Sequence, residues 1–317
     1  MEWYWWLIVI LAFLGVGAMG LIFSTMNIAR GLYNDLLVRT SPNKWSRECS
    51  APENEEHYGM YLDGVKWAND NMNCMIELSV KNDGLKLFGE YYDFGFKKAV
   101  IIIPGKNEGL RYSYYFAFPY KDMGYNVLVI DIRAHGMSEG ICDSVGYHEQ
   151  YDVIKWMGLL RDEYGVEEFA IHGLCIGGAT AIYVAANENC PQELKTIICE
   201  GPFSSFYDVL TQRMKTLNKP AFPVRDELRY LIKKHSGTDI KKYTPLKRAK
   251  NVKIPVLFIC GKQDISSLPE KCRQLFDCLG SEKKQMVWFD KGAHSHLRVS
   301  NLPEYDEAIA RFIRGLE

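Results

Sequence analysis

The sequence predicts an α/β protein with a mainly parallel sheet covered by helices on both faces. From residue 73 onward, short apolar runs typical of strands alternate with stretches of helical pattern. The clearest run is 99–103, Ala-Val-Ile-Ile-Ile, which is apolar throughout and ends at Pro104-Gly105. A strand buried on both faces has this pattern. The 317 residues are enough for one large domain with appendages.

The first two predicted strands form a hairpin. Residues 75–80 and 85–92 alternate in polarity, and Asn82-Asp83-Gly84 between them is a turn sequence. Further strands follow the run at 99–103, and they are predicted at 126–130, 169–172, 196–199, 255–260 and 285–289. The helices are predicted at 112–123, 148–164, 179–186, 270–278 and 303–313.

The N-terminus predicts a transmembrane helix. Residues 3–23 carry no charge and, at about 21 residues, are long enough to cross a bilayer. A cleaved signal peptide is the alternative, but no basic residue precedes the apolar run. Basic residues follow the run, which places the large domain in the cytoplasm. The predicted organisation is an anchor at 1–25, a tether at 26–55 and a catalytic domain at 56–317.

Charge and cysteine usage exclude several classes of protein. The 38 basic and 39 acidic side chains give a net charge of −1, so no nucleic-acid partner is indicated. Nine cysteines lack the spacing of a zinc site or a disulfide framework, which favours a reducing compartment. No metal or cofactor is expected.

One stretch interrupts the α/β alternation. Residues 202–250 contain no buried strand but carry aromatic and basic residues at helical spacing. The segment predicts a small helical cap over the site, with two ordinary packing helices as the alternative. Phe203, Tyr207 and Phe222 are its candidate substrate-binding residues, together with Phe206.

The candidate nucleophile is Cys175. Gly173-Leu174-Cys175-Ile176-Gly177-Gly178 follows a predicted strand and precedes a predicted helix. This is the setting of the nucleophile elbow, usually G-x-S-x-G, with sulfur in place of oxygen. A helix N-terminus favours a thiolate there. The alternative is a glycine-rich turn with an incidental buried cysteine.

An acid and a base follow in the order that such a triad requires. Asp264 lies in a loop after the 255–260 strand, and His294 follows the last strand. Asp264 would orient the imidazole, unless it only caps a helix; Glu200 is the second candidate acid. We prefer His294 to His296 because it comes first after the turn at 291–293.

Acyl transfer also requires donors for the oxyanion. The backbone N–H of Ile176 follows the nucleophile directly, and the N–H of Lys106 lies in the loop after the 99–103 strand. The Lys106 ammonium is expected to be solvated, with binding of an anionic group as the alternative.

The chain resembles bacterial membrane-anchored α/β-hydrolases of the serine aminopeptidase-like or acylaminoacyl-peptidase-like kind. The resemblance covers residue 56 to the C-terminus and rests on Asp131-Ile132-Arg133-Ala134-His135-Gly136-Met137-Ser138-Glu139-Gly140, Pro202-Phe203-Ser204-Ser205, Pro245-Leu246 and the stretch 294–305. It implies the α/β-hydrolase fold, the triad Cys175, Asp264 and His294, and oxyanion donors Ile176 and Lys106. Two departures are Pro104-Gly105 in place of His-Gly, and cysteine in place of serine.

The sequence therefore predicts hydrolysis of a carboxylic ester or thioester through an acyl-enzyme on Cys175. The expected partners are a small acyl substrate, for which lipophilic character fits the anchor, and the membrane itself. Acyl transfer to another acceptor is one alternative. A serine position that has lost its chemistry, in a membrane-tethered interaction protein, is the other.

Overall fold

A single twisted sheet organises the computed structural model, which describes residues 3–39 and 55–316. Its strand order is β1-β2-β4-β3-β5-β6-β7-β8. The antiparallel pairs are β1 with β2 and β2 with β4, and the remaining neighbours are parallel. The strands are β1 Met75–Asn82, β2 Leu85–Tyr92, β3 Lys98–Ile103, β4 Tyr125–Ile130, β5 Glu168–Leu174, β6 Leu194–Glu200, β7 Val256–Gly261 and β8 Lys284–Phe289.

Helices cover both faces of the sheet, as predicted. One face packs against α5 and α6 and the other against α2, α4 and α12, each through its own apolar core. The predicted helix at 112–123 is broken into short pieces around Pro119. Apart from α1 and the helices of the insertion, the helices are α2 Glu55–Asp70, α3 Leu110–Ser113, α4 Phe118–Lys121, α5 Glu149–Tyr164, α6 Ile176–Ala185, α10 Pro269–Asp277, α11 Leu297–Ser300 and α12 Glu304–Arg314, with 3₁₀ turns at Met72–Cys74, Tyr114–Phe116 and Ala249–Asn251.

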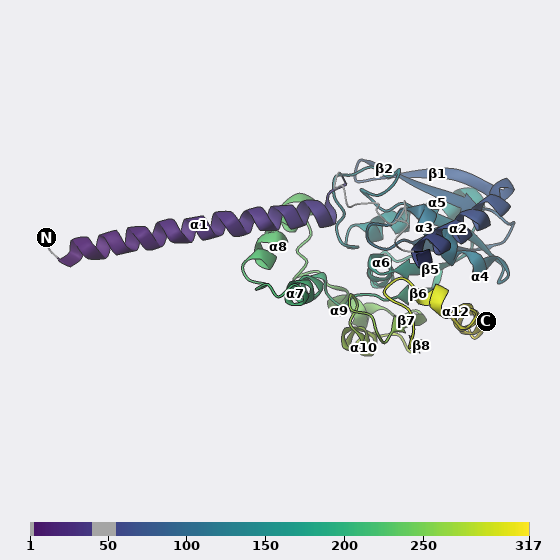
Figure 1. The fold of residues 1–317 in the computed structure, drawn as a ribbon. Coiled ribbons are helices and arrows are strands. Elements are labelled where there is room, and N and C mark those ends of the chain that lie inside the picture. The colour runs from purple at the N-terminus through teal and green to yellow at the C-terminus, as the bar shows by residue number, and fades with distance from the viewer. Residues whose placement is uncertain (1–2, 40–54, 317) are drawn as a thin grey trace.

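The N-terminal helix α1, Trp3–Leu37, is a candidate membrane span (Figure 1). It is exposed and apolar through Phe23, and its buried residues begin at Thr25. The tether predicted from residue 26 is wrong at its start, because the helix continues without a break to Leu37 and packs against the insertion. The rest of the predicted tether, 40–54, lies outside the described residues.

The insertion at 202–250 is helical, as predicted. It contains α7 Phe206–Thr216, α8 Val224–Ser236 and α9 Pro245–Arg248. α8 lies beside the C-terminal third of α1, α7 packs against α8, and α9 returns to pack against α6 (Figure 1). The α7 N-terminus is capped by Ser205, whose hydroxyl accepts a hydrogen bond from the Asp208 N–H.

Candidate active site

The turn between β5 and α6 has the geometry of a nucleophile elbow. Cys175 sits there at φ +52° and ψ −106°, a conformation that side chains rarely adopt. A Cβ on Gly173 would lie 2.2 Å from the Gly177 carbonyl carbon, and one on Gly177 would lie 2.2 Å from the Ile103 carbonyl oxygen. Both positions therefore require glycine, because β5, α6 and β3 approach too closely for any side chain.

Two loops at the carboxyl end of the sheet bring an acid and a base together. His294 Nδ1 lies 2.7 Å from Asp264 Oδ2. The other oxygen, Oδ1, accepts hydrogen bonds from the Ser266 and Ser267 N–H groups, each at 2.8 Å. Asp264 thus holds its own loop and orients the imidazole, but it does not cap α10, whose N-cap residue is Leu268.

The charge state of His294 is coupled to Cys175. Burial by itself lowers the pKa of His294, but the Cys175 thiolate and the hydrogen bond to Asp264 raise the pKa well above its ordinary value. Within the described chain, the buried Nε2 atom has no fully aligned hydrogen-bond partner. His294 and Cys175 line the same pocket. This loose pairing is common for a base and a nucleophile before substrate binds.

The alternative acid and base occupy other positions. Glu200, at the end of β6, is buried and accepts a 2.5 Å hydrogen bond from the Tyr305 hydroxyl, whereas Asp264 is the carboxylate that lies at His294 Nδ1. Burial raises the pKa of Glu200 to about 7. His296 is also buried and does not line the pocket that contains Cys175. The geometry therefore favours Asp264 and His294.

The pocket over Cys175 has a volume of about 220 Å³. Its floor is the elbow and the loop after β3, and its walls come from α1, α7 and the loops that contain Asp264 and His294. The walls are mostly apolar. The lining residues are Leu36, Lys106, Asn107, Cys175, Ile176, Phe203, Phe206, Val209, Leu210, Arg213, Ser266, Ser267, His294 and Ser295.

Comparison with known proteins agrees with the fold. A family model described as "alpha/beta hydrolase fold" matches residues 98–243, from β3 through the elbow to the loop between α8 and α9. The chain has the α/β-hydrolase fold. Its sheet order and elbow are those expected of this fold.

The chain is similar to a known protein in sequence and to solved structures in fold, in each case at low sequence identity. The chain is 26% identical over 219 residues to the uncharacterized protein YqkD of Bacillus subtilis, covering 68% of this chain and 71% of that protein. The Pyrococcus furiosus esterase Pf2001 superposes with a TM-score of 0.62 at 20% identity, over 78% of this chain and 94% of the esterase. An acylaminoacyl peptidase from Pyrococcus horikoshii gives a TM-score of 0.56 at 19% identity, over 76% of this chain and 40% of the peptidase.

The two predicted oxyanion donors lie at this α/β-hydrolase pocket. Ile176 is the first residue of α6, where an N–H has no partner within the helix. Lys106 lies in the loop after β3, which is held by a 2.7 Å hydrogen bond from the Gly105 N–H to Glu108. Neither the Ile176 nor the Lys106 N–H donates to another group within the described residues.

The side chain of Lys106 differs from both expectations for it. The ammonium is neither solvated nor directed at the pocket: it contacts the Leu36 carbonyl at the end of α1 and lies 3.4 Å from the Asp143 carboxylate. An amine at this position satisfies an orphan carbonyl of the helix C-terminus. Lys106 therefore ties the loop after β3 to α1.

Only part of the predicted substrate-binding set lines the pocket. Phe203 does, together with Phe206. The prediction for Tyr207 is wrong, because this residue does not line the pocket: its hydroxyl donates to Asp226 at 2.8 Å and its ring packs under Arg225. The prediction for Phe222 is also wrong, because its side chain is 72% exposed and lies between α7 and α8, outside the pocket.

Sequence reasoning missed the wall contributed by α1. Leu36 belongs to a buried stripe that also contains Ala29, Tyr33 and Leu37. These residues are spaced as neighbours on one helical face, and this periodicity in the sequence could have indicated that the end of the helix packs against the rest of the protein.

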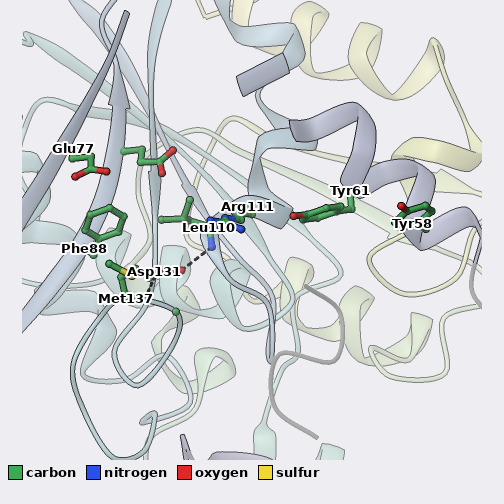
Figure 2. Close-up of a pocket in the computed structure, with 10 residues that line it drawn as sticks. Tyr58, Tyr61, Glu77, Phe88, Leu110, Arg111, Asp131 and Met137 are labelled. Carbon is green, nitrogen blue, oxygen red and sulfur yellow. Dashed lines mark hydrogen bonds between the residues drawn. The ribbon is translucent and has the colours of Figure 1, made fainter. Parts of the chain in front are cut away.

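A second cavity, of about 650 Å³, lies between α2 and the β1–β2 hairpin (Figure 2). It is lined by Tyr58, Tyr61, Glu77, Phe88, Glu90, Leu110, Arg111, Asp131, Gly136 and Met137. Asp131, from the motif loop 131–140, accepts hydrogen bonds from the Leu110 and Met137 N–H groups at 2.7 and 2.8 Å. This motif residue therefore holds loops together. Among the residues that the structure describes, the lining of this cavity contains no histidine paired with a nucleophile.

Proposed function

We propose that this protein hydrolyses carboxylic esters or thioesters through an acyl-enzyme on Cys175. The observation that carries the proposal is the shared pocket of Cys175, on its strained elbow, and His294, held by Asp264 at 2.7 Å. A nucleophile, a base and an orienting acid in this arrangement define acyl-transfer chemistry irrespective of sequence position.

Acylation begins with the thiolate of Cys175 and the imidazolium of His294. The sulfur attacks the substrate carbonyl, and the carbonyl electron pair moves to the oxygen. The N–H groups of Ile176 and Lys106 donate hydrogen bonds to that oxyanion. When the intermediate collapses, the bond to the leaving group breaks, and the leaving group takes the proton from His294 Nε2. Cys175 is then linked to the acyl group as a thioester.

Deacylation uses the same base in the opposite direction. Neutral His294 takes a proton from water, and the hydroxyl oxygen attacks the thioester carbonyl. The carbon–sulfur bond breaks, and the carboxylic acid and the Cys175 thiolate are released. Asp264 holds the imidazole in the tautomer that both half-reactions require.

The leaving group favours esters and thioesters over amides. In the tetrahedral intermediate the Cys175 thiolate competes with the leaving group for expulsion, and an amine is the poorer of the two until His294 has protonated it. A thioester instead releases another thiolate, so the intermediate expels the leaving group about as readily as it expels the Cys175 thiolate. The apolar walls from Leu36, Phe203 and Leu210 suit an acyl chain.

We also propose that α1 spans a bilayer with the catalytic domain on the cytoplasmic side. Residues 3–23 are apolar and exposed, as a lipid-facing helix requires. Basic residues Arg30 and Arg39 follow the apolar segment, whereas none precedes it.

A short-chain nitrophenyl ester and acyl-thioester panel on the detergent-solubilised full chain tests the hydrolase proposal. We expect turnover by the wild type and loss of turnover in Cys175→Ala. Cys278→Ala, which removes an exposed thiol outside the pocket, is the matched control and retains activity. Mass spectrometry of stopped reactions should find the acyl mass on the peptide containing Cys175. Turnover that persists in Cys175→Ala, or appears only in Cys175→Ser, contradicts the proposal.

A further inference from the structure

Helices α1 and α8 run side by side in the same direction. The Thr25 hydroxyl donates to Glu227 Oε1 at 2.8 Å, across 202 residues of sequence. About two helical turns further along, the rings of Tyr33 and His235 stack with centroids 5.1 Å apart. This second pair has the same separation in sequence, so the two helices rise together residue for residue.

This register fixes the level of the cap's tip along α1. Because α8 begins at Val224, its first residue is level with Ile22. The connection from α7, residues 217–223, joins α8 at the end that is level with the close of the exposed apolar segment at Phe23. That segment is about 30 Å long at 1.5 Å per residue, which matches the hydrocarbon thickness of a bilayer.

The side chains at this tip suit a lipid surface. Leu217 is 51% exposed and Phe222 is 72% exposed. The exposed charged residues of the segment 213–223 are Arg213, Lys215 and Lys219, and the segment contains no carboxylate. Apolar side chains flanked by cations are typical of protein segments that lie in the interface of an anionic membrane.

We propose that the tip of the cap, residues 217–222, is a second membrane contact set in the interface of an anionic bilayer. The inference rests on the proposed span of α1, which places the tip at that depth. Leu217 and Phe222 insert among the acyl chains nearest the surface, while Lys215 and Lys219 contact the headgroups. The cap is thus held at the membrane both through α8, which packs on α1, and through its own tip.

Photocrosslinking of the full chain in nanodiscs that contain phosphatidylglycerol tests this contact. Benzoylphenylalanine is placed at Phe222, at Leu21 in α1, or at Tyr230 in α8. Tyr230 is 56% exposed and is level with Ile28, beyond the apolar segment. We expect phospholipid adducts of similar yield at positions 222 and 21, and loss of the adduct at position 230.

Each outcome distinguishes the tip from the span. An adduct at position 21 without one at 222 overturns the second contact and leaves the span intact. Absence of both adducts overturns the span and, with it, the contact. An adduct at position 230 equal in yield to that at 222 also overturns the second contact, because lipid crosslinking would then not depend on how far along α1 the position lies. The readout involves no turnover, so failure of the hydrolase proposal would not affect it.

The Lys215→Gln/Lys219→Gln variant should lose part of the adduct at 222 but none at 21.

Discussion

Cys175 and His294 line one pocket, and the charge of His294 depends on Cys175. The thiolate helps to raise the pKa of His294, against the lowering effect of burial. In general, an imidazolium beside a cysteine favours the thiolate form, which is the attacking species in the proposed mechanism.

This coupling predicts fast alkylation of Cys175 in mildly acidic solution. At about pH 6, where an ordinary thiol with a pKa near 8.5 is almost entirely protonated, iodoacetamide should label Cys175 before the exposed Cys278. His294→Ala should slow labelling of Cys175 at least tenfold, by roughly the effect of one pKa unit. Peptide mass spectrometry over a time course measures both rates. Equal rates for the two cysteines in the wild type would refute the paired thiolate.

The raised pKa of Glu200 predicts that the free energy of unfolding falls as the pH rises, which is the opposite of the usual effect of a carboxylate. Burial raises its pKa from 4.5 to about 7, so the folded state holds a proton that the unfolded state releases. The stabilisation is complete below pH 4.5 and is lost as the pH rises through 7, by on the order of 3 kcal/mol. Glu200→Gln should remove this loss, so the variant gains stability relative to the wild type above pH 7. Denaturant titrations in detergent at pH 5 and pH 8 measure it; a constant difference between the two proteins would contradict the assignment.

At the scale of elements, the elbow tolerates no side chain at its second glycine. Gly177→Ala places a Cβ 2.2 Å from the Ile103 carbonyl oxygen, so α6 or β3 must shift. We expect a loss of roughly 3 kcal/mol or more, together with loss of Cys175 labelling. Gly158→Ala is the matched control, since its Cβ meets nothing within 4 Å on α5. It should stabilise by roughly 0.5–1 kcal/mol. Thermal melting compares the two, and equal midpoints would rule out the steric argument.

The strands and the triad order could be predicted because their signals are local. The apolar run 99–103 and the glycines around Cys175 indicate a buried strand and a tight turn through neighbouring residues alone. The register between α1 and α8 is different, since it joins residues 202 positions apart. Tyr207 and Phe222 were misplaced for the same reason: helical spacing shows that a face exists, but not what it packs against.

At the scale of the whole molecule, α1 is both a candidate anchor and part of the catalytic domain. Its end contributes Leu36 to the pocket wall and accepts a hydrogen bond from Lys106, whose N–H is a proposed oxyanion donor. The loop that would stabilise the transition state is therefore fastened to the helix that would cross the bilayer. A catalytic domain cut free at residue 55, as the sequence alone suggested, would lack both contacts.

Two truncations test this dual role. A chain without residues 1–23 loses only the exposed apolar segment, so it should be soluble and should keep its melting temperature and Cys175 labelling. A chain without residues 1–39 also loses a buried stripe, in which large apolar side chains are each worth roughly 2 kcal/mol. It should melt at lower temperature and label slowly at Cys175, because Lys106 is released and the pocket wall is open. Leu36→Ala in the full chain should reproduce part of this effect without removing the helix. If the two truncations melt and react alike, α1 beyond residue 23 is only a tether.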